Sequence, residues 1–379
     1  MNKKTIIIFN TSKGYGGWEF QTLNLAKQLQ QKFNIVVIYS SINTRFEKMI
    51  KKNKEITSES INYYSKRLSF ILNFFSIAVL FKLTKKICTY KPVLIIACQG
   101  HIEASSIIYF LKPFIKPPII SYIPICEYLS KSSRYPSIGK IKDLINIFYF
   151  KLPSSFITIS RYQKKLIKSR CKNKNVTILP ILHETKNLKI YNKYSSREKL
   201  GFFDANVKLF GLPGRLTYQK GFDIFLELVV SCKSDFDNVI FVIVGDGDLK
   251  DTLSEYIANN NISHLVQLLE FQNNVSLFYS AIDGLIMPAR YEGIPHNILL
   301  DAIQLRIPLI MSNISDANQY LPINNLFDPF NPKNFMETLQ QFINKPDDFI
   351  VYTDLGKHSY KSYRNNINKL FGKETIAAS

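Results

Sequence analysis

Short, unbroken apolar runs alternate along this chain with segments of helical periodicity, and the alternation begins again after residue 205. Such runs are typical of parallel strands that are buried on both faces, with the intervening helices covering the sheet. The pattern therefore predicts an α/β fold of two Rossmann-like, doubly wound parallel-sheet domains. The predicted strands are Thr5–Phe9, Ile35–Tyr39, Val93–Cys98, Ile119–Ile123 and Phe156–Ser160, then Leu209–Leu212, Val239–Val244, Val266–Leu269, Gly284–Met287 and Pro308–Met311.

A polar, weakly periodic segment, residues 183–194, separates the two predicted sheets, and 379 residues suffice for two to three domains. We therefore predict a first domain of residues 1–182 and a second of residues 183–349, with the helical tail 350–379 packing back on the first. A capping box at Ser195–Glu198 predicts a short helix near the start of the second domain. Doubly wound sheets bind ligands at the carboxyl ends of their strands, so we expect an interdomain cleft at these ends.

The net charge of +20 is unevenly distributed. Residues 1–200 hold 35 Lys and Arg against 9 Asp and Glu, whereas residues 201–379 hold 14 against 20. This asymmetry indicates that the first half meets an anionic partner, which could be nucleic acid, a phospholipid surface or a phosphorylated acceptor. A compositional bias of the genome towards lysine is the alternative. No aromatic-interleaved RNA motif or recognition helix accompanies the basic residues, so we expect no nucleic acid partner.

The longest uncharged apolar stretch, Leu68–Phe81, has 14 residues, which are too few to span a bilayer. It is either a buried core helix or a helix that lies in the membrane interface. The sequence therefore favours a protein that is soluble or bound peripherally to a membrane.

The cysteines are odd in number and widely spaced, with no C-x-x-C pair, which indicates a reducing compartment and neither a disulfide framework nor a zinc site. The sequence after Met1 leads directly into a short strand, and no signal peptide is visible. We therefore expect a cytoplasmic location. The five cysteines are Cys88, Cys98, Cys126, Cys171 and Cys232.

Two basic residues follow the first predicted strand of the second sheet. Gly214 allows a tight turn, and Arg215 and Lys220 come after it. An arginine can bind two phosphate oxygens with its planar fork, while a lysine acts as a point charge. Gly221 has no Cβ, so backbone can approach a ligand there. The segment is competent to bind phosphate, although basic residues in such a loop are more often only solvated.

The next strand of the second sheet ends in Gly245-Asp246-Gly247-Asp248. The pair of aspartates invites a metal site, because carboxylate oxygens are ligands of divalent ions. The same four residues are also good turn formers before a helix, and we prefer that interpretation.

The segment after Gly284–Met287 carries the strongest signal. It contains Glu292, Gly293, Ile294 and Pro295 in a loop, and the apolar pattern that follows predicts a helix from Ile298 to Leu305 with Asn297 as its N-cap. The free amides of that N-terminus can bind phosphate. A second carboxylate, Asp301, lies one turn into the helix.

Together these segments resemble the C-terminal domain of the retaining GT-B glycosyltransferases of family 4, whose patterns are G-R-L…K-G, V-G-D-G-x-L and E-G-x-P…E-A. The resemblance is specific over residues 207–330. Gly16 and Gly17, before an amphipathic segment, are similar to the glycine loop of that family's first domain.

The resemblance implies a role for each position. Arg215 and Lys220 would neutralise the leaving pyrophosphate, Glu292 would bind hydroxyls of the donor sugar, and Asp301 would hold the ribose. It implies front-face transfer with retention, in which the leaving phosphate helps to deprotonate the acceptor, and it implies no cofactor and no metal. The positions that it assigns to the donor are Gly16, Gly17, Gly214, Gly245, Asp246, Gly247, Gly293, Ile294, Pro295 and Asp301.

One spacing departs from the family. Eight residues separate Glu292 from Asp301, where the family has seven, and the second carboxylate is an aspartate. Either the loop holds one extra residue, for which His296 is the candidate, or Asp301 does not reach the nucleotide.

In the first domain, His101 and Glu127 follow predicted strands, where cleft residues lie. His101 is a candidate catalytic residue and Glu127 an acceptor-side candidate, although a lone histidine at a strand end is more often structural.

We therefore expect a bacterial hexosyltransferase, peripheral on the cytoplasmic face of the inner membrane through its basic first domain. Its donor would be a UDP-, GDP- or ADP-sugar, and its acceptor a lipid-linked, lipopolysaccharide or cell-surface oligosaccharide. The alternatives are transfer to a soluble acceptor, nucleotide-sugar 2-epimerisation, and non-catalytic nucleotide-sugar binding.

Overall fold

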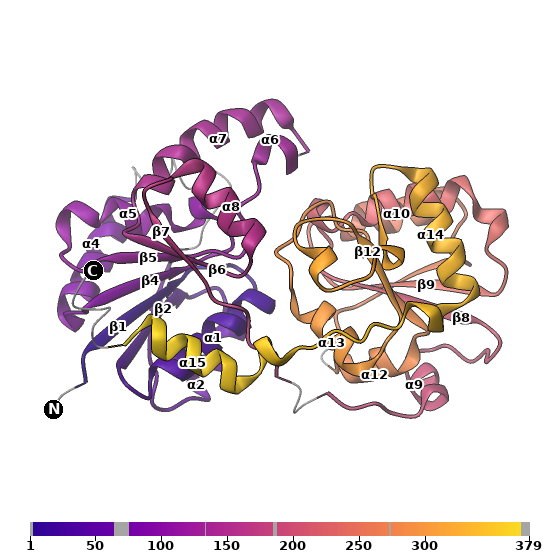
Figure 1. Ribbon diagram of the computed structural model, residues 1–379, viewed down its shortest axis with the longest axis horizontal. Coiled ribbons are helices and arrows are strands. Elements are labelled where there is room, and N and C mark those ends of the chain that lie inside the picture. The colour runs from indigo at the N-terminus through magenta and orange to yellow at the C-terminus, as the bar shows by residue number, and fades with distance from the viewer. Residues whose placement is uncertain (1–2, 64–75, 133, 185–187, 273, 373–379) are drawn as a thin grey trace. The chain divides into compact units, whose positions relative to one another are not determined.

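The computed structural model describes residues 3–63, 76–132, 134–184, 188–272 and 274–372. The chain divides into two compact units (Figure 1). The first contains residues 1–182 and 356–379, and the second contains residues 183–355. The predicted α/β fold of two parallel-sheet domains is confirmed.

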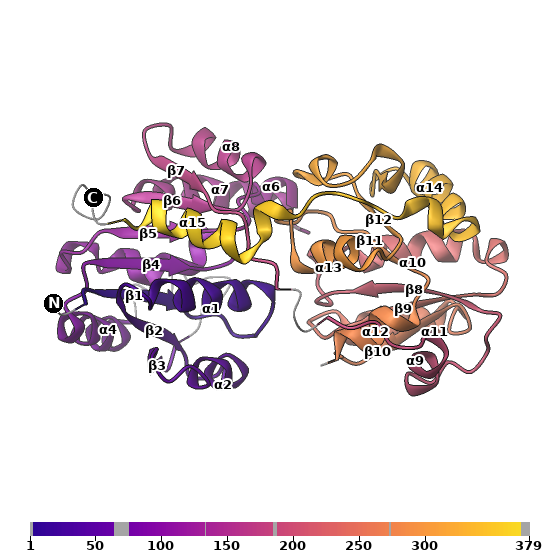
Figure 2. The same ribbon diagram turned by 60° about the horizontal axis from the view of Figure 1, so that its bottom comes forward.

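The described residues of the first unit form a seven-stranded parallel sheet in the order β3-β2-β1-β4-β5-β6-β7. Helices α4, α5, α7 and α8 share one hydrophobic core with one face of this sheet. On the other face α1 and α15 lie side by side (Figure 2). The strands are Thr5–Asn10, Asn34–Ser40, Thr57–Ile61, Leu94–Cys98, Ile119–Tyr122, Ser155–Thr158 and Asn175–Ile178 for β1 to β7; the helices are α1 Gly17–Leu29, α2 Thr44–Lys51, α4 Ile77–Tyr90, α5 Ser106–Phe110, α6 Leu129–Ser132, α7 Pro136–Lys151, α8 Arg161–Arg170 and α15 Tyr360–Leu370.

The C-terminal helix α15 is part of the first unit because its apolar side is buried there. Tyr363 and Ile367 are both buried. Just before the helix, the buried ring of His358 donates from Nδ1 to the carbonyl oxygen of Ile181 at 2.8 Å. Leu182, which follows Ile181, is the last residue before the chain enters the second unit. Its backbone exchanges two hydrogen bonds with the side chain of Gln21 in α1. Hydrogen bonds therefore hold the chain both where it leaves the first unit, at Leu182, and where it returns, at His358.

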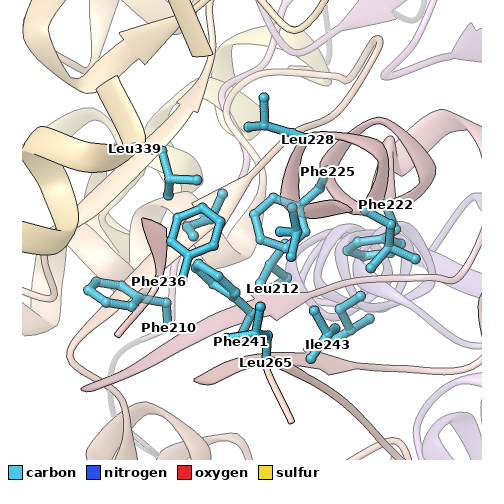
Figure 3. Packing of buried hydrophobic residues seen from close by; sticks show 14 of the residues in the cluster. Phe210, Leu212, Phe222, Phe225, Leu228, Phe236, Phe241, Ile243, Leu265 and Leu339 are labelled. Carbon is cyan, nitrogen blue, oxygen red and sulfur yellow. The ribbon is translucent and has the colours of Figure 1, made fainter. Parts of the chain in front are cut away.

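The described residues of the second unit form a six-stranded parallel sheet in the order β10-β9-β8-β11-β12-β13. One face packs against α10, α11 and α14, and its core is rich in phenylalanine (Figure 3). The rings of Phe225 and Phe241 meet edge to face at 4.9 Å, an arrangement that adds to the burial of their area. The strands β8 to β13 are Lys208–Pro213, Val239–Val244, Val266–Leu269, Gly284–Met287, Leu309–Ser312 and Leu326–Phe327; the helices are α9 Lys193–Lys199, α10 Phe222–Ser231, α11 Lys250–Asn259, α12 Val275–Ala281, α13 Asn297–Leu305 and α14 Pro332–Asn344.

The sequence prediction missed the edge strands β3, β7 and β13. Strand β3 reads Thr-Ser-Glu-Ser-Ile and so lacks the apolar run that marks a strand buried on both faces. Edge strands have one neighbour only, so they can be short and polar. Of the apolar stretch Leu68–Phe81, residues 68–75 lie outside the described residues, and Ile77–Phe81 begin α4. No helix in the described ranges is both long and apolar enough to cross a membrane.

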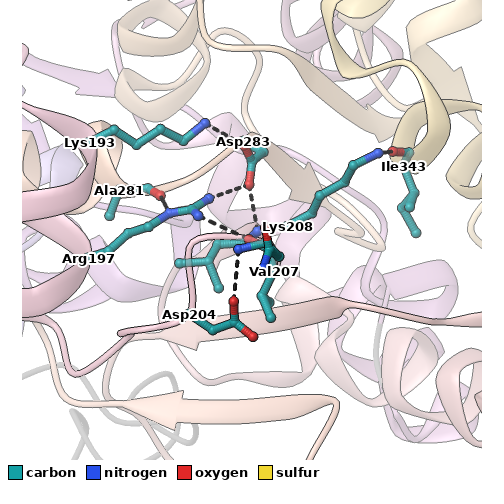
Figure 4. Close-up of polar contacts among 10 residues, drawn as sticks. Lys193, Arg197, Asp204, Val207, Lys208, Ala281, Asp283 and Ile343 are labelled. Atoms are coloured by element: carbon teal, nitrogen blue, oxygen red, sulfur yellow. Dashed lines mark hydrogen bonds and ion pairs between the residues drawn. The ribbon is translucent and has the colours of Figure 1, made fainter.

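Helix α9 begins earlier than the predicted capping box. Asn192, not Ser195, is its N-cap, and the Asn192 side chain accepts a hydrogen bond from the Ser195 amide. Arg197, which the prediction placed in that box, is instead buried and binds Asp283, whose carboxylate also accepts from the amide of Leu209 in β8 (Figure 4). The helix is therefore anchored to the amino end of the central strand.

Candidate active site

Three loops at the carboxyl ends of β8, β9 and β11 are joined by backbone hydrogen bonds. Strand β8 lies between the other two, so its loop can reach both. The Leu216 amide donates to the carbonyl oxygen of Asp246 at 2.9 Å, and the Leu249 amide donates to Leu216 at 2.9 Å. On the other side the Arg290 amide donates to Gln219 at 2.9 Å. The structure thus brings together the three segments that the sequence singled out.

Two glycines are required because backbone passes against backbone at this junction. A Cβ on Gly245 would lie 1.9 Å from the carbonyl oxygen of Gly214. Gly221 has a φ of +70°, and a Cβ there would lie 2.0 Å from the carbonyl oxygen of Pro288. A carbon atom cannot approach an oxygen so closely. At Gly221 the missing Cβ therefore makes room for the neighbouring loop, and the approach of backbone to a ligand there stays a prediction.

Arg290 fixes the loop after β11 to the segment after β8, a role that was not evident from the sequence. Its guanidinium forms a bidentate ion pair with Asp223, with distances of 2.6 and 2.8 Å. It also donates to the carbonyl oxygen of Tyr218 at 2.8 Å and lies 3.9 Å from the centre of the Tyr218 ring. Two parallel hydrogen bonds fix orientation as well as distance. This arginine is therefore a positioning residue for the loop that contains Glu292.

Glu292 and Lys220, which the sequence placed on separate loops, form an ion pair in the interior of the site. The Glu292 carboxylate also accepts from Gln219 Nε2 at 3.1 Å and from the Gly293 amide at 3.2 Å. Burial is the largest single effect on Glu292 and raises its pKa, but Lys220, His296 and Arg215 together outweigh it and hold the pKa below its ordinary value. The carboxylate is therefore ionised at neutral pH and can accept hydrogen bonds from hydroxyl groups.

The N-cap of α13 is His296 and not Asn297. The Nδ1 atom of His296 accepts a hydrogen bond from the Leu299 amide at 3.2 Å. Burial, followed by the nearby charge of Lys220, lowers the pKa of His296 to about 4. The ring is therefore neutral at neutral pH, which leaves Nδ1 free of a proton so that it can accept this bond. The helix begins at Asn297, one residue before the predicted start.

The neutral state of His296, which is half-buried, predicts a pH dependence of stability. Its folded pKa of about 4 lies below its ordinary value of 6.5, so the unfolded chain binds more protons between these values. The free energy of unfolding should therefore fall, by about 1–2 kcal/mol, as the pH drops from 7 to 5. His296→Asn keeps a capping side chain without this titration and should show a smaller fall. Urea unfolding of both proteins at the two pH values tests this, and equal falls would contradict it.

Asp301 is held by two side chains of its own unit. His183 Nε2 lies 2.9 Å from Oδ1, and the Tyr279 hydroxyl donates to Oδ2 at 3.0 Å. Burial, together with this carboxylate, raises the pKa of the Tyr279 hydroxyl well above its ordinary value, so it stays a donor. The structure thus gives both oxygens of Asp301 a partner, and its role towards a ribose stays a prediction. Neither His183 nor Tyr279 was identified from the sequence.

Arg215 is exposed, and it forms no ion pair with a carboxylate of the described residues. Asp246 is exposed as well, and its Oδ1 accepts from the Gly247 amide at 2.9 Å, as expected of a turn. The described residues contain no group of three or more His, Cys, Asp or Glu that could hold a metal ion. Ile294 and Pro295 are buried between Glu292 and the helix and are joined by a cis peptide bond.

The candidate residues of the first unit lie at the carboxyl ends of three neighbouring strands, β1, β4 and β5. Gly16 is the N-cap of α1, which begins at Gly17, and the Gly16 amide donates to Glu19 Oε2 at 2.8 Å. His101 follows β4. Between the two, Gln99 Nε2 donates to the Thr11 hydroxyl at 3.0 Å and joins the ends of β4 and β1.

Glu127 follows β5, and the Tyr162 hydroxyl donates to its Oε2 at 3.3 Å. Burial raises the pKa of Glu127, against the effects of Tyr162, Gln163 and Arg170. A carboxyl group with a raised pKa at a strand end is a candidate for binding or proton transfer. Its partner Tyr162 was missed because it lies on α8, which is distant in sequence.

The chain is similar to known proteins in both fold and sequence. The chain aligns over 99% of its length with 97% of HepE from Anabaena, a structure solved in complex with UDP and glucose, with a TM-score of 0.72 and 16% identity. The fold is therefore of the GT-B type, as predicted. Residues 195–362, which include nearly all of the second unit, match the family glycosyl transferases group 1.

Two curated relatives have higher sequence identity. An uncharacterized glycosyltransferase of Methanocaldococcus jannaschii is 28% identical over 244 residues, which are 62% of this chain and 58% of the relative. A UDP-Gal:alpha-D-GlcNAc-diphosphoundecaprenol alpha-1,3-galactosyltransferase of Escherichia coli is 32% identical over 142 residues, 37% of this chain and 36% of the relative. The matched segments span less than two thirds of either relative.

Proposed function

We propose that this protein is a retaining glycosyltransferase of family 4, which moves a sugar from a nucleotide-sugar donor to a lipid-linked or cell-surface oligosaccharide acceptor. The observation that carries the proposal is the junction of three loops, where Lys220 pairs with the buried carboxylate of Glu292 and Arg215 stands exposed beside them. A nucleoside diphosphate sugar carries two phosphates and several hydroxyls, and it needs cations and a carboxylate in this arrangement.

Each group has a role in the proposed reaction. Arg215 and Lys220 would bind the pyrophosphate, the amides of Gly293 and Ile294 would donate to it, and Glu292 would accept from hydroxyls of the donor sugar. The acceptor oxygen forms a bond to the anomeric carbon on the face from which the phosphate oxygen leaves. The leaving phosphate takes the proton of the acceptor hydroxyl. Preplaced cations stabilise the charge that develops on the phosphate, without a metal ion or cofactor.

Several features support an acceptor at a membrane. The relative from Escherichia coli acts, by its name, on a sugar linked to diphosphoundecaprenol. The first 200 residues of this chain carry an excess of 26 positive charges, which would attract an anionic phospholipid surface. We therefore propose a peripheral location on the cytoplasmic face of the membrane, with His101 and Glu127 on the acceptor side.

A thermal-shift screen against UDP-, GDP- and ADP-sugars tests the donor. A donor that binds only the folded state should stabilise the protein by about 2.7 kcal/mol when its concentration is one hundred times its Kd. We expect one nucleotide series to raise the Tm and the others to leave it unchanged. If no nucleotide or nucleotide-sugar raises the Tm, the donor site is wrong.

A product assay then separates the alternatives. Retention predicts a product whose anomeric configuration, read by NMR, equals that of the donor. A 2-epimerase would release a free sugar or an epimerised product without any acceptor, and a non-catalytic binder would release no nucleotide at all. Transfer to a soluble oligosaccharide with the same rate as to its lipid-linked form would favour the soluble-acceptor alternative.

A further inference from the structure

Helix α7 buries Tyr149 and Phe150 in the core of the first unit, but its earlier turns depart from the pattern of an ordinary amphipathic helix. Its buried positions include Gly139, Asp143 and Asn146, whereas most of its large aliphatic side chains are exposed. We call four exposed residues the apolar ridge of α7, because their spacing of three or four residues puts them along one side of the helix. They are Ile138, Ile141, Leu144 and Phe148, which are 52%, 63%, 72% and 58% exposed.

Specific contacts hold α7 in this orientation. Both carboxylate oxygens of Asp143 face α6, where they accept from the amides of Leu129 and Ser130 at 2.8 and 2.9 Å and from the Ser130 hydroxyl at 2.6 Å. A Cβ on Gly139 would lie 2.4 Å from the carbonyl oxygen of Leu129, so only glycine allows the two helices to pack so closely. Turning the ridge inwards would break these bonds and bury a carboxylate elsewhere.

The ridge lies between basic residues. At 100° per residue, Lys140 and Lys142 fall on opposite flanks of the ridge. Three more basic residues, Lys131, Arg134 and Lys151, lie in or beside α6 and α7, and the only carboxylate between residues 128 and 151 is Asp143, which is fully engaged with α6. The exposed apolar surface is therefore bordered by positive charge and not by negative charge.

We propose that the apolar ridge of α7 inserts into the interface of an anionic phospholipid bilayer, with the flanking lysines at the level of the headgroups. A cationic border around an apolar helix face is the combination that binds such a surface. A second copy of the chain fits less well, since two basic first domains would repel each other. The inference rests on the proposed membrane-linked acceptor, and it names the surface by which the enzyme reaches that acceptor. Figure 1 locates α6 and α7 at one edge of the first unit.

Vesicle sedimentation with the full chain tests the proposal. We expect binding to vesicles of phosphatidylcholine mixed with phosphatidylglycerol, and weak binding to phosphatidylcholine alone. Leu144→Ser combined with Phe148→Ser should weaken binding by about tenfold or more, because two apolar groups are lost from the interface. Phe203→Ser, which removes an aromatic side chain that is 80% exposed in the second unit, is the matched control and should bind as the wild type does.

A second measurement separates insertion from simple charge attraction. The variant Leu144→Trp adds a second tryptophan to Trp18. Brominated lipid acyl chains should quench its fluorescence more strongly than they quench the fluorescence of the wild type, which has Trp18 alone. Equal vesicle binding by the wild type and the double variant would overturn the proposal, as would an unquenched Leu144→Trp. A change from dimer to monomer in the double variant without lipid would assign the ridge to a second copy instead.

The thermal shift with nucleotide-sugars keeps this test separate from the proposed function. The ridge variants should bind donor as the wild type does, because the ridge lies on another unit than the three loops. Donor binding without ridge-dependent vesicle binding would refute only the present inference. Ridge-dependent vesicle binding without any donor binding would refute only the donor site.

Discussion

Replacing Arg215 with alanine is expected to lower kcat by about 10²–10³ while leaving the free energy of unfolding unchanged. The side chain is exposed and forms no ion pair with a described carboxylate, so the folded state loses little without it. Its proposed partner is the pyrophosphate, whose negative charge increases in the transition state. Nucleotide release at saturating donor and acceptor measures the effect, and circular dichroism on heating gives the stability.

Lys233→Ala is the matched control, because it removes an exposed positive charge from the same unit at a position that follows α10 and is distant from the three loops. It should keep full activity. If Arg215→Ala also kept full activity, Arg215 would not bind the leaving group and the mechanism would fail.

Lys220→Ala should also abolish activity almost completely, but, unlike Arg215→Ala, it should affect stability as well. Lys220 is the partner of Glu292, and its removal leaves a buried carboxylate unpaired. We therefore expect a lower free energy of unfolding together with the loss of turnover. The contrast between the two cations separates a group that acts on the substrate from one that also holds the site together.

The sequence predicted the central strands and the three loops, because both depend on local pattern. A strand buried on both faces needs an unbroken apolar run, and a loop that passes against another backbone needs glycine, as at Gly245. Edge strands such as β3 carry neither signal. Parallel topology then places the loops at one edge of the sheet, whatever the details of each strand.

The pairings across the loops could not be predicted in the same way. Arg290 binds Asp223, and Asp301 binds His183, over separations that no spacing rule covers. The capping role of His296 was hidden because Asn297, the next residue, is the better capping type. In helix α7, likewise, Asp143 is buried against α6 and does not face solvent. In each case tertiary contacts override the local preference.

The buried pair of Arg197 and Asp283 gives the second large expected effect, this time on stability. The Arg197 guanidinium donates to the carbonyl oxygens of Ala281 and Val207 at 2.9 and 3.0 Å and to Asp283 at 2.6 Å (Figure 4). Its side chain is only 5% exposed. Arg197→Met should cost about 3–5 kcal/mol, because it leaves Asp283 without its buried partner and two carbonyl groups without donors.

Lys193→Met is the control that isolates burial, since Lys193 binds the same carboxylate of Asp283 from a position that is 44% exposed. An exposed ion pair contributes less than about 1 kcal/mol, so this variant should unfold close to the wild type. Amide hydrogen exchange in β8 and β11 measures both variants within the second unit. Equal protection of these amides from exchange in the two variants would mean that stability depends on the net charge at Asp283 and not on the buried geometry of Arg197. Faster exchange in Arg197→Met alone would show that α9 stabilises the sheet that carries the three loops, through one buried guanidinium.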